Sequence, residues 1–300
     1  MGKVYEFSEI AEHRVPLPLD FLTAKKLALD NLSVSVRNGE IYGAKVFGSV
    51  AKGTPNERSD FDIVIITEND TALAFLKEKF TAIKARTRVG IEPIVVSREF
   101  AENGNHSIDL LFLKHIRSIS DEDNVVGRNP LDVLNPCSDL PPTLVLKQYL
   151  IQKIRRFSEG AFVDSKEDSN RLLQRALEEP VNLGRRILQI LPQVGQPLDM
   201  KDDGKKEVIE LFRETFRNTP LIYEFSSLVE KDAAYTNLLR KALQGVVLQK
   251  EYEIEISKLS SSIPQALNWT NEVMRSYVKL LEGNKKGIEG SLLYRGKESL

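Results

Sequence analysis

The sequence predicts an α+β protein: an N-terminal part of alternating strands and helices, followed by an all-helical domain. Through residue 97, short apolar runs alternate with turn-forming residues. Asp, Asn, Gly and Pro then concentrate between residues 120 and 142, and helical spacing of apolar residues dominates beyond. A chain of 300 residues has room for two domains. We predict domains at residues 1–120 and 143–285, a linker at 121–142 and a flexible tail at 286–300.

The first domain should consist of three strands and three helices. A helix is expected over residues 19–36, with Gly39 as its stop signal. Pro93 cannot donate a ladder hydrogen bond, so its strand must lie at an edge or begin there. Ser107 is the candidate N-cap of the last helix. The predicted strands are 41–47, 61–67 and 89–97, and the remaining helices are 71–86 and 106–120.

The second domain should be a helical bundle, because no strong strand signal separates its periodic segments. The LEEP stretch, which includes Glu178 and Glu179, is read as an exposed helix end. The predicted helical segments are residues 144–157, 182–194, 206–216, 232–259 and 264–283.

Composition narrows the functional classes. With 42 basic and 43 acidic side chains, the net charge of −1 does not point to nucleic acid or membrane as a partner. Cys137 is the only cysteine, which excludes an intrachain disulfide and favours a reducing, cytoplasmic location. The N-terminus lacks the apolar stretch of a signal peptide, and no apolar run is long enough to cross a bilayer. Whether the chain forms a homodimer stays open.

Two aspartates at the start of an apolar strand are the main chemical signal. Side chains alternate along a strand, so Asp60 and Asp62 lie on one face with Cα atoms about 7 Å apart. Carboxylate oxygens are ligands that Mg²⁺ prefers. Upstream, Gly48 lets the backbone approach a phosphate and Ser49 can donate hydrogen bonds to it, while Lys52 can add a cation. The pattern predicts a site for a metal and a nucleotide; an ordinary turn with capping residues is the simpler alternative.

These residues resemble the polymerase-beta-like nucleotidyltransferase superfamily. GSVAKG followed by SDFDIVII is similar to the glycine-serine and paired-aspartate motifs in the minimal and antibiotic-modifying branches of this superfamily. The resemblance covers residues 20–118. The resemblance implies a mixed-sheet core that binds two Mg²⁺ ions, for which Mn²⁺ could substitute. It also implies a nucleoside triphosphate substrate, with ATP as the first candidate. Gly48 and Ser49 would hold phosphates, and Asp60 and Asp62 would bind metal.

The resemblance also implies a third carboxylate on a neighbouring strand. Glu92 is a lone acid in an apolar run, and EPIVVSREF is similar in spacing to the corresponding stretch of the antibiotic-modifying branch. Asp109 is the rival, but it follows the candidate N-cap Ser107 by two residues, where an acid is favoured by the helix dipole. We favour Glu92.

The helical half offers further candidates. Lys147 or Lys153 could reach the triphosphate, or this basic stretch could be a solvated helix face. A general base for the acceptor hydroxyl is expected, and Glu159, Glu178 and Glu179 are not distinguished by any motif. The helical half contains no histidine, which excludes a histidine-dependent ribonuclease or phosphohydrolase there. His106 and His115 are read as surface or packing residues.

The sequence thus predicts a nucleotidyltransferase that moves a nucleoside monophosphate to an acceptor hydroxyl and releases pyrophosphate. The acceptor is either a small molecule or a macromolecule such as protein or RNA. A non-catalytic nucleotide-binding protein that keeps the fold is the alternative.

Overall fold

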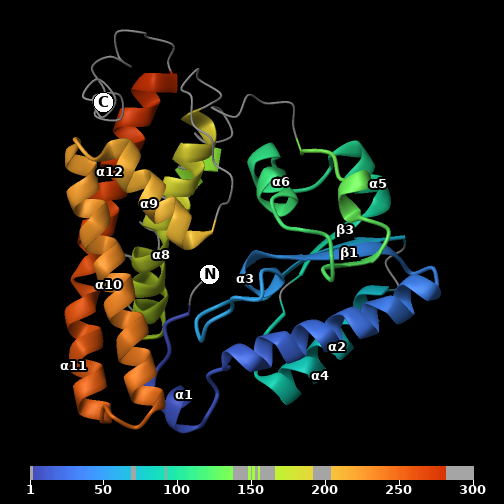
Figure 1. Ribbon diagram of the computed structural model, residues 1–300, viewed down its shortest axis with the longest axis horizontal. Helices are drawn as coiled ribbons and strands as arrows, with labels where there is room; N and C mark the ends of the chain where they lie inside the picture. The colour runs from blue at the N-terminus through green and yellow to red at the C-terminus, as the bar shows by residue number, and fades with distance from the viewer. Residues whose placement is uncertain are drawn as a thin grey trace. The chain divides into compact units, whose positions relative to one another are not determined.

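The computed structural model describes residues 3–68, 72–91, 93–137, 148–149, 151–152, 155, 166–191 and 204–281 (Figure 1). The chain divides into two compact units. The first contains Met1–Lys3 and Glu12–Asp139, and the second contains Val4–Ala11 and Leu140–Leu300. The chain therefore passes between the units after residues 3, 11 and 139. The domain limits predicted from the sequence stay a prediction.

The first unit is built on a mixed sheet of four strands. Its strands lie in the order β3-β2-β1-β4. β1 pairs in antiparallel fashion with both β2 and β4, whereas β2 and β3 are parallel. This arrangement confirms the predicted α+β fold with a mixed sheet. The strands are β1 (Ile41–Phe47), β2 (Asp62–Thr67), β3 (Ile94–Ser97) and β4 (Val125–Gly127).

Helices cover both faces of this sheet (Figure 1). The helices α2 (Pro18–Arg37) and α4 (Ala72–Thr87) lie on one face, and α5 (Arg98–Asn103) and α6 (Leu110–Arg117) lie on the other. Strand β2 serves both cores because its side chains alternate. Ile63 and Ile65 are buried toward α2 and α4, and Val64 and Ile66 are buried in the core under α5 and α6.

Strand β4 lies within residues 121–142, which the sequence analysis reads as a linker. Val125 and Val126 pair with β1, and the backbone N–H of Val46 donates to the carbonyl oxygen of Asn124 at 2.9 Å. The short 3₁₀ helix η1 (Pro130–Asp132) follows. A strand of three residues among Asp, Asn and Gly is too short to be predicted from alternation of apolar residues in the sequence. Its pairing with β1 in the folded chain defines it.

Helix α6 begins two residues later than the sequence suggests. Asp109, not Ser107, is its N-cap, because the Asp109 Oδ1 atom accepts a hydrogen bond from the Phe112 N–H at 2.8 Å. Ile108 is 1% exposed. Burial of Ile108 favours a helix start after it, and the neighbouring aspartate then supplies the cap.

The second unit is helical and confirms the predicted helical region. Its core contains an aromatic cluster in which the ring of Phe225 lies 4.3 Å from that of Phe212 and 5.7 Å from that of Trp269, between centroids. The described helices are α1 (Phe7–Ala11), α8 (Lys166–Ile190), α9 (Lys205–Phe216), α10 (Pro220–Leu243), α11 (Gln249–Ser260) and α12 (Ser262–Leu281).

Residues near the N-terminus are part of this helical unit. The backbone N–H of Tyr5 donates to the hydroxyl of Tyr235 at 2.7 Å, and the hydroxyl of Tyr252 donates to the Tyr5 carbonyl at 2.8 Å. The Tyr5 side chain is 4% exposed. Residues near the N-terminus and residues of α10 and α11 therefore contribute to one core.

Two helical predictions were wrong in detail. Residues 232–259 form two helices, because α10 ends at Leu243 and Gly245 adopts a left-handed φ of 71° before α11 begins. The LEEP stretch is not an exposed helix end: α8 continues through Pro180, and Glu179 is 3% exposed. Most of the predicted helix 144–157 lies outside the described residues.

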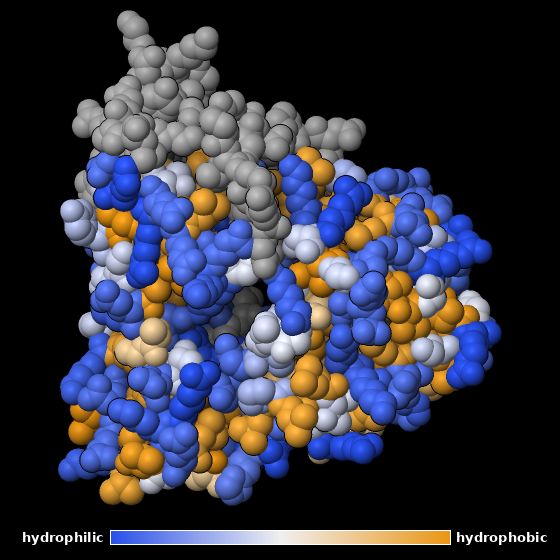
Figure 2. Space-filling view, viewed as in Figure 1, coloured by the Kyte–Doolittle hydropathy of each residue, from blue (hydrophilic) through white to orange (hydrophobic). Residues whose placement is uncertain are grey.

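None of the helices that the structure describes is long and apolar enough to cross a membrane. Figure 2 shows hydrophilic side chains interspersed with hydrophobic ones on the visible face. Exposed apolar residues of the first unit include Leu19 on α2 and Leu73 on α4.

Candidate active site

The end of β1 lies directly against the first residue of β2. Phe47 pairs with Asp62 in the antiparallel register, and Gly48 follows as the first residue of the short helix α3 (Gly48–Ala51). Gly48 has a φ of 72°, and a Cβ atom built on it would lie 2.2 Å from the Asp62 Oδ2 atom. Only glycine fits both the backbone conformation and this contact. The predicted phosphate-binding turn and one predicted metal ligand are therefore neighbours.

The serine of this turn is held by the loop that leads to the aspartates. The hydroxyl of Ser49 donates to the hydroxyl oxygen of Ser59 at 3.0 Å, and the same Ser59 oxygen accepts from the backbone N–H of Asn56 at 2.9 Å. Asp60 follows directly. This hydrogen bond brings two segments ten residues apart to one place. Ser59 was not predicted as a site residue, although it directly precedes Asp60.

Asp60 and Asp62 flank a residue that fixes their orientation. Phe61 is 2% exposed in the core beneath α2 and α4, and it forms an isolated parallel bridge with Ile91. Because side chains alternate, Asp60 and Asp62 lie on the opposite face, the one that α5 and α6 cover. Both aspartates are half-buried. Asp60 precedes the first residue of β2, so the shared face of the two carboxylates stays a prediction.

Aromatic side chains of α6 pack against Phe47 on that face. The ring of Phe47, the register partner of Asp62, makes edge-on contacts with the rings of Phe112 and His115 on α6, with centroids 5.6 and 5.9 Å apart. His115 is half-buried and packs in this cluster. Its contact with Phe47 could not be found from helical spacing alone, because the contact joins α6 to β1.

A buried lysine lies on the same face and was missed by the sequence analysis. Lys45 is fully buried in β1; its Nζ atom donates to the carbonyl oxygen of Ile119 at 3.0 Å and forms an ion pair with Asp121. Burial lowers the pKa of Lys45 below its ordinary value. These contacts attach the segment after α6 to the sheet. The one feature of the sequence that could have pointed to Lys45 is a charged residue at a strand position whose neighbours are apolar.

The other predicted site residues lie elsewhere in the structure or outside the described residues. Lys52 caps α3 at its C-terminal end and is half-buried, four residues after Gly48. Glu92, Lys147, Lys153 and Glu159 lie outside the described residues. Asp109 is the N-cap of α6, which accounts for an acid at that position without a metal. Glu178 and Glu179 belong to α8 in the other unit.

His106 has a local structural role. Its Nδ1 atom accepts a hydrogen bond from the backbone N–H of Ile108 at 3.0 Å, which requires an unprotonated Nδ1. Burial lowers the pKa of His106 below its ordinary value. The contact and the pKa direction both favour the neutral imidazole.

The donor chemistry of the site fits a hard divalent cation. Within the described ranges, no group of three or more His, Cys, Asp or Glu side chains that could hold a metal is present. Mg²⁺ in nucleotide sites is commonly held by one or two carboxylates together with substrate phosphates. Asp60 and Asp62 are carboxylates of this kind, and the Gly48 backbone lies beside Asp62.

Comparison with known families identifies this region. Residues 29–122 match the model described as Nucleotidyltransferase domain. This part of the chain is a nucleotidyltransferase domain, consistent with the polymerase-beta-like superfamily, and it includes Gly48, Ser49, Asp60 and Asp62. No curated protein and no solved structure matches the chain. Such domains typically use a nucleoside triphosphate and divalent metal ions, so the match supports nucleotidyl transfer in general.

Proposed function

We propose that the chain is an enzyme that transfers a nucleoside monophosphate from a nucleoside triphosphate to an acceptor hydroxyl group and releases pyrophosphate. ATP is the first candidate substrate. The observation that carries the proposal is the contact between Gly48 and Asp62 inside a nucleotidyltransferase domain. It puts a backbone suited to phosphate beside a carboxylate suited to metal.

Each residue near this contact has a proposed role. Asp60, Asp62 and Glu92 would hold two Mg²⁺ ions, which when bound neutralise charge on the attacking and leaving oxygens. Gly48 and Ser49 would bind the terminal phosphates. Ser59 is a positioning residue, because it holds the Ser49 hydroxyl.

Glu92 is preferred over Asp109 as the third carboxylate. Asp109 already caps α6 through its Oδ1 atom. The pairs on either side of Glu92, Phe61 with Ile91 and Val64 with Ile94, join the strand that carries Asp62 to the segment that carries Glu92. That pairing supports Glu92 as a neighbour of the aspartates.

Two lysines complete the proposed nucleotide site. Lys52 would place a cation near the triphosphate from the end of α3, and Lys147 would add one from the helical half. A reducing, cytoplasmic setting is proposed as well, because Cys137 is the only cysteine and the chain therefore forms no intrachain disulfide.

The reaction is an in-line displacement at the α-phosphorus. The acceptor hydroxyl oxygen forms a bond to phosphorus as the bond to pyrophosphate breaks, and the hydroxyl proton passes to the expected general base. The protein contributes mainly by positioning and electrostatics. Asp62 is held by β-sheet pairing, and Ser49 by Ser59, so both are oriented before substrate binds.

The test is incubation of the purified chain with each α-labelled nucleoside triphosphate and Mg²⁺, with and without cell lysate. Pyrophosphate release and the fate of the label are followed. Asp62→Asn keeps the size of the side chain and removes its charge; we expect turnover at least about 10²-fold lower with the fold intact. Asp30→Asn, an exposed position on α2 at the opposite face of the sheet, is the matched control.

The fate of the label separates the acceptor classes. Label on RNA or protein supports a macromolecular acceptor, and label on a small metabolite or drug supports a small-molecule acceptor. Nucleotide binding without pyrophosphate from any acceptor pool would favour the non-catalytic alternative. Near-normal turnover of Asp62→Asn would overturn the metal assignment.

A further inference from the structure

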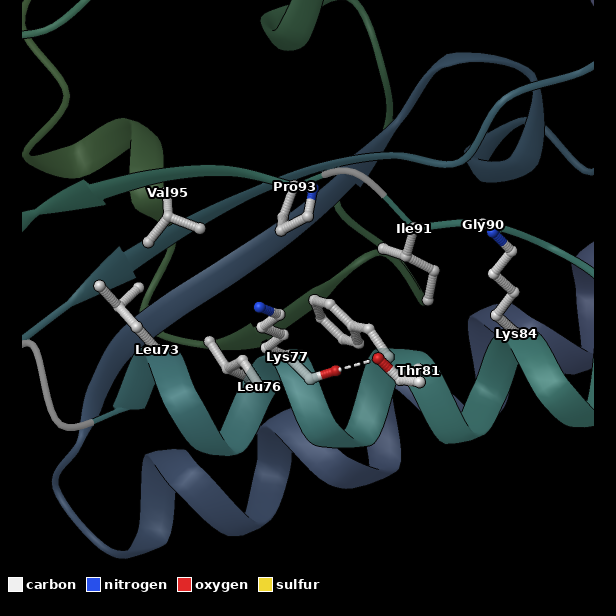
Figure 3. Close-up of a pocket in the computed structure, with 10 residues that line it drawn as sticks. Leu73, Leu76, Lys77, Thr81, Lys84, Gly90, Ile91, Pro93 and Val95 are labelled. Atoms are coloured by element: carbon white, nitrogen blue, oxygen red, sulfur yellow. Dashed lines mark hydrogen bonds between the residues drawn. The ribbon is translucent and has the colours of Figure 1, made fainter.

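A groove lies on the side of the first unit away from the aspartates, between α4 and the segment that leads into β3. Its volume is about 310 Å³. Figure 3 shows side chains of α4 and of this segment pointing toward one another across it. Leu76, Phe80, Ile91 and Val95 belong to, or pack against, the core beneath α2 and α4, whereas the aspartates occupy the other face. The walls are mainly apolar and include Leu73, Leu76, Phe80, Ile91, Pro93 and Val95.

The groove runs along an edge of the sheet. Strand β3 is the terminal strand in the order β3-β2-β1-β4, and β2 is its only strand neighbour among the described residues. Ile94 and Val95 are half-exposed. An edge strand presents a row of backbone N–H and C=O groups that can pair with another extended chain. Its short length and the proline before it limit how long a partner strand can be.

Two lysines border this apolar groove. Lys77 and Lys84 are exposed, and Figure 3 shows both side chains extending from α4 toward the β3 segment. Within the described part of the chain, neither forms an ion pair, whereas Lys79 on the same helix pairs with Glu78. Seven residues of helix separate the Cα atoms of Lys77 and Lys84 by about 10.5 Å.

We propose that this groove binds an extended segment of a partner protein, which adds to β3 as a strand. Apolar side chains at alternate positions of the segment enter the groove, and carboxylates at its ends, beyond the residues that pair with β3, reach Lys77 and Lys84. Main-chain pairing supplies affinity, while the apolar walls and the lysines supply selectivity. The site takes an acidic, apolar polypeptide and is separate from the proposed nucleotide site.

The lining favours a polypeptide over a nucleic acid. Single-stranded nucleic acids bind through aromatic side chains on which bases stack. The one aromatic residue that lines the groove is Phe80, which is 6% exposed and therefore offers no open ring face. The half-exposed aliphatic residues of β3 instead match alternate side chains of a strand.

The test uses the full chain and three fluorescein-labelled peptides, measured by fluorescence anisotropy. EVTVTVE has the proposed chemistry, KVTVTVK reverses the terminal charges, and EVTPTVE removes a backbone donor in the middle. The variant Lys77→Glu/Lys84→Glu reverses the charge of the groove. Lys79→Glu/Arg86→Glu is the matched control, because it changes the net charge equally on the same helix at positions that do not line the groove.

We expect the natural chain to bind EVTVTVE at least about tenfold more tightly than KVTVTVK, as two exposed ion pairs replaced by two repulsions would give. The groove variant should reverse this preference, and the control variant should keep it. EVTPTVE should bind more weakly than EVTVTVE to all three chains. Added EVTVTVE should protect β3 amides from hydrogen exchange.

Three results would overturn the proposal. The first is equal binding of the three peptides, or no binding of EVTVTVE. The second is a loss of preference in the control variant equal to that in the groove variant, since general charge would then explain binding. The third is displacement of bound EVTVTVE by oligouridylate or by dodecanoate at lower concentration than by unlabelled EVTVTVE, because the groove would then take a nucleic acid or an acyl chain.

Discussion

Replacement of Gly48 by alanine tests how closely the turn and the aspartate depend on one another. The new Cβ atom would lie 2.2 Å from Asp62 Oδ2, so the carboxylate must recede by about 1 Å to reach ordinary van der Waals contact. A misplacement of about 1 Å in a catalytic arrangement can lower turnover about 10²-fold. The left-handed φ of 72° adds about 1–2 kcal/mol of backbone strain. We therefore expect a large loss of turnover with a smaller loss of stability.

Gly53→Ala is the matched control. Gly53 has nearly the same backbone conformation, with a φ of 70°, but a Cβ atom there would meet nothing within 4 Å. Both variants carry the backbone strain, and only Gly48→Ala displaces Asp62. Both substitutions should lower the melting temperature by a similar amount, as measured by thermal unfolding.

Two readouts report the displacement. Pyrophosphate release measures turnover, and the electron paramagnetic resonance signal of Mn²⁺ with ATP measures metal binding independently of any acceptor. Gly48→Ala should weaken both, and Gly53→Ala should leave both near the natural values. Equal turnover and equal Mn²⁺ affinity in the two variants would refute the reasoning that Gly48 is required by Asp62.

Three further outcomes are expected. Burial lowers the pKa of His106, so the unfolded state binds a proton more tightly; stability should be full above about pH 6.5 and fall as pH decreases through the lower folded pKa. His106→Asn keeps an acceptor for the same backbone N–H and should flatten this dependence in chemical denaturation; an unchanged slope would contradict the assignment. Tyr5→Ala should destabilise the helical unit by about 3 kcal/mol, reported by fluorescence of the buried Trp269, whereas Tyr223→Ala, 77% exposed, should change stability by less than about 0.5 kcal/mol; equal effects would show that the N-terminal segment adds nothing. Ser59→Ala should lower turnover by up to about tenfold through loss of one hydrogen bond, with the melting temperature nearly unchanged, and full activity would remove its positioning role.

The local sequence was sufficient to predict a residue's role where that role depends on its neighbours in the chain. Asp60 and Asp62 share a face because strands alternate, and Gly48 ends a strand in a turn, so both features could be predicted. The third carboxylate was less accessible, since Glu92 and Asp109 both suited local patterns. The hydrogen bond of Asp109 to the Phe112 N–H shows why an acid stands at Asp109.

Long-range contacts explain what sequence reasoning missed. Lys45 is tolerated inside β1 because the Ile119 carbonyl and Asp121 meet its ammonium group, more than seventy positions later. Strand β4 forms because it pairs with β1, and its three residues are too few to show a hydrophobic alternation in the sequence. The groove beside β3 likewise arises from two segments that meet only in the folded chain.

The sequence by itself determined the two-part organisation, the apolar strands, and the glycine-serine turn and paired aspartates of the nucleotidyltransferase domain. These follow from periodicity and spacing over a few residues, which act before any distant contact forms. Only the tertiary structure decided that Asp62 lies against Gly48, that Ser59 holds Ser49, and that Tyr5 belongs to the helical unit. Each of these contacts joins residues that are distant in the chain, and burial and pairing in the folded state select them.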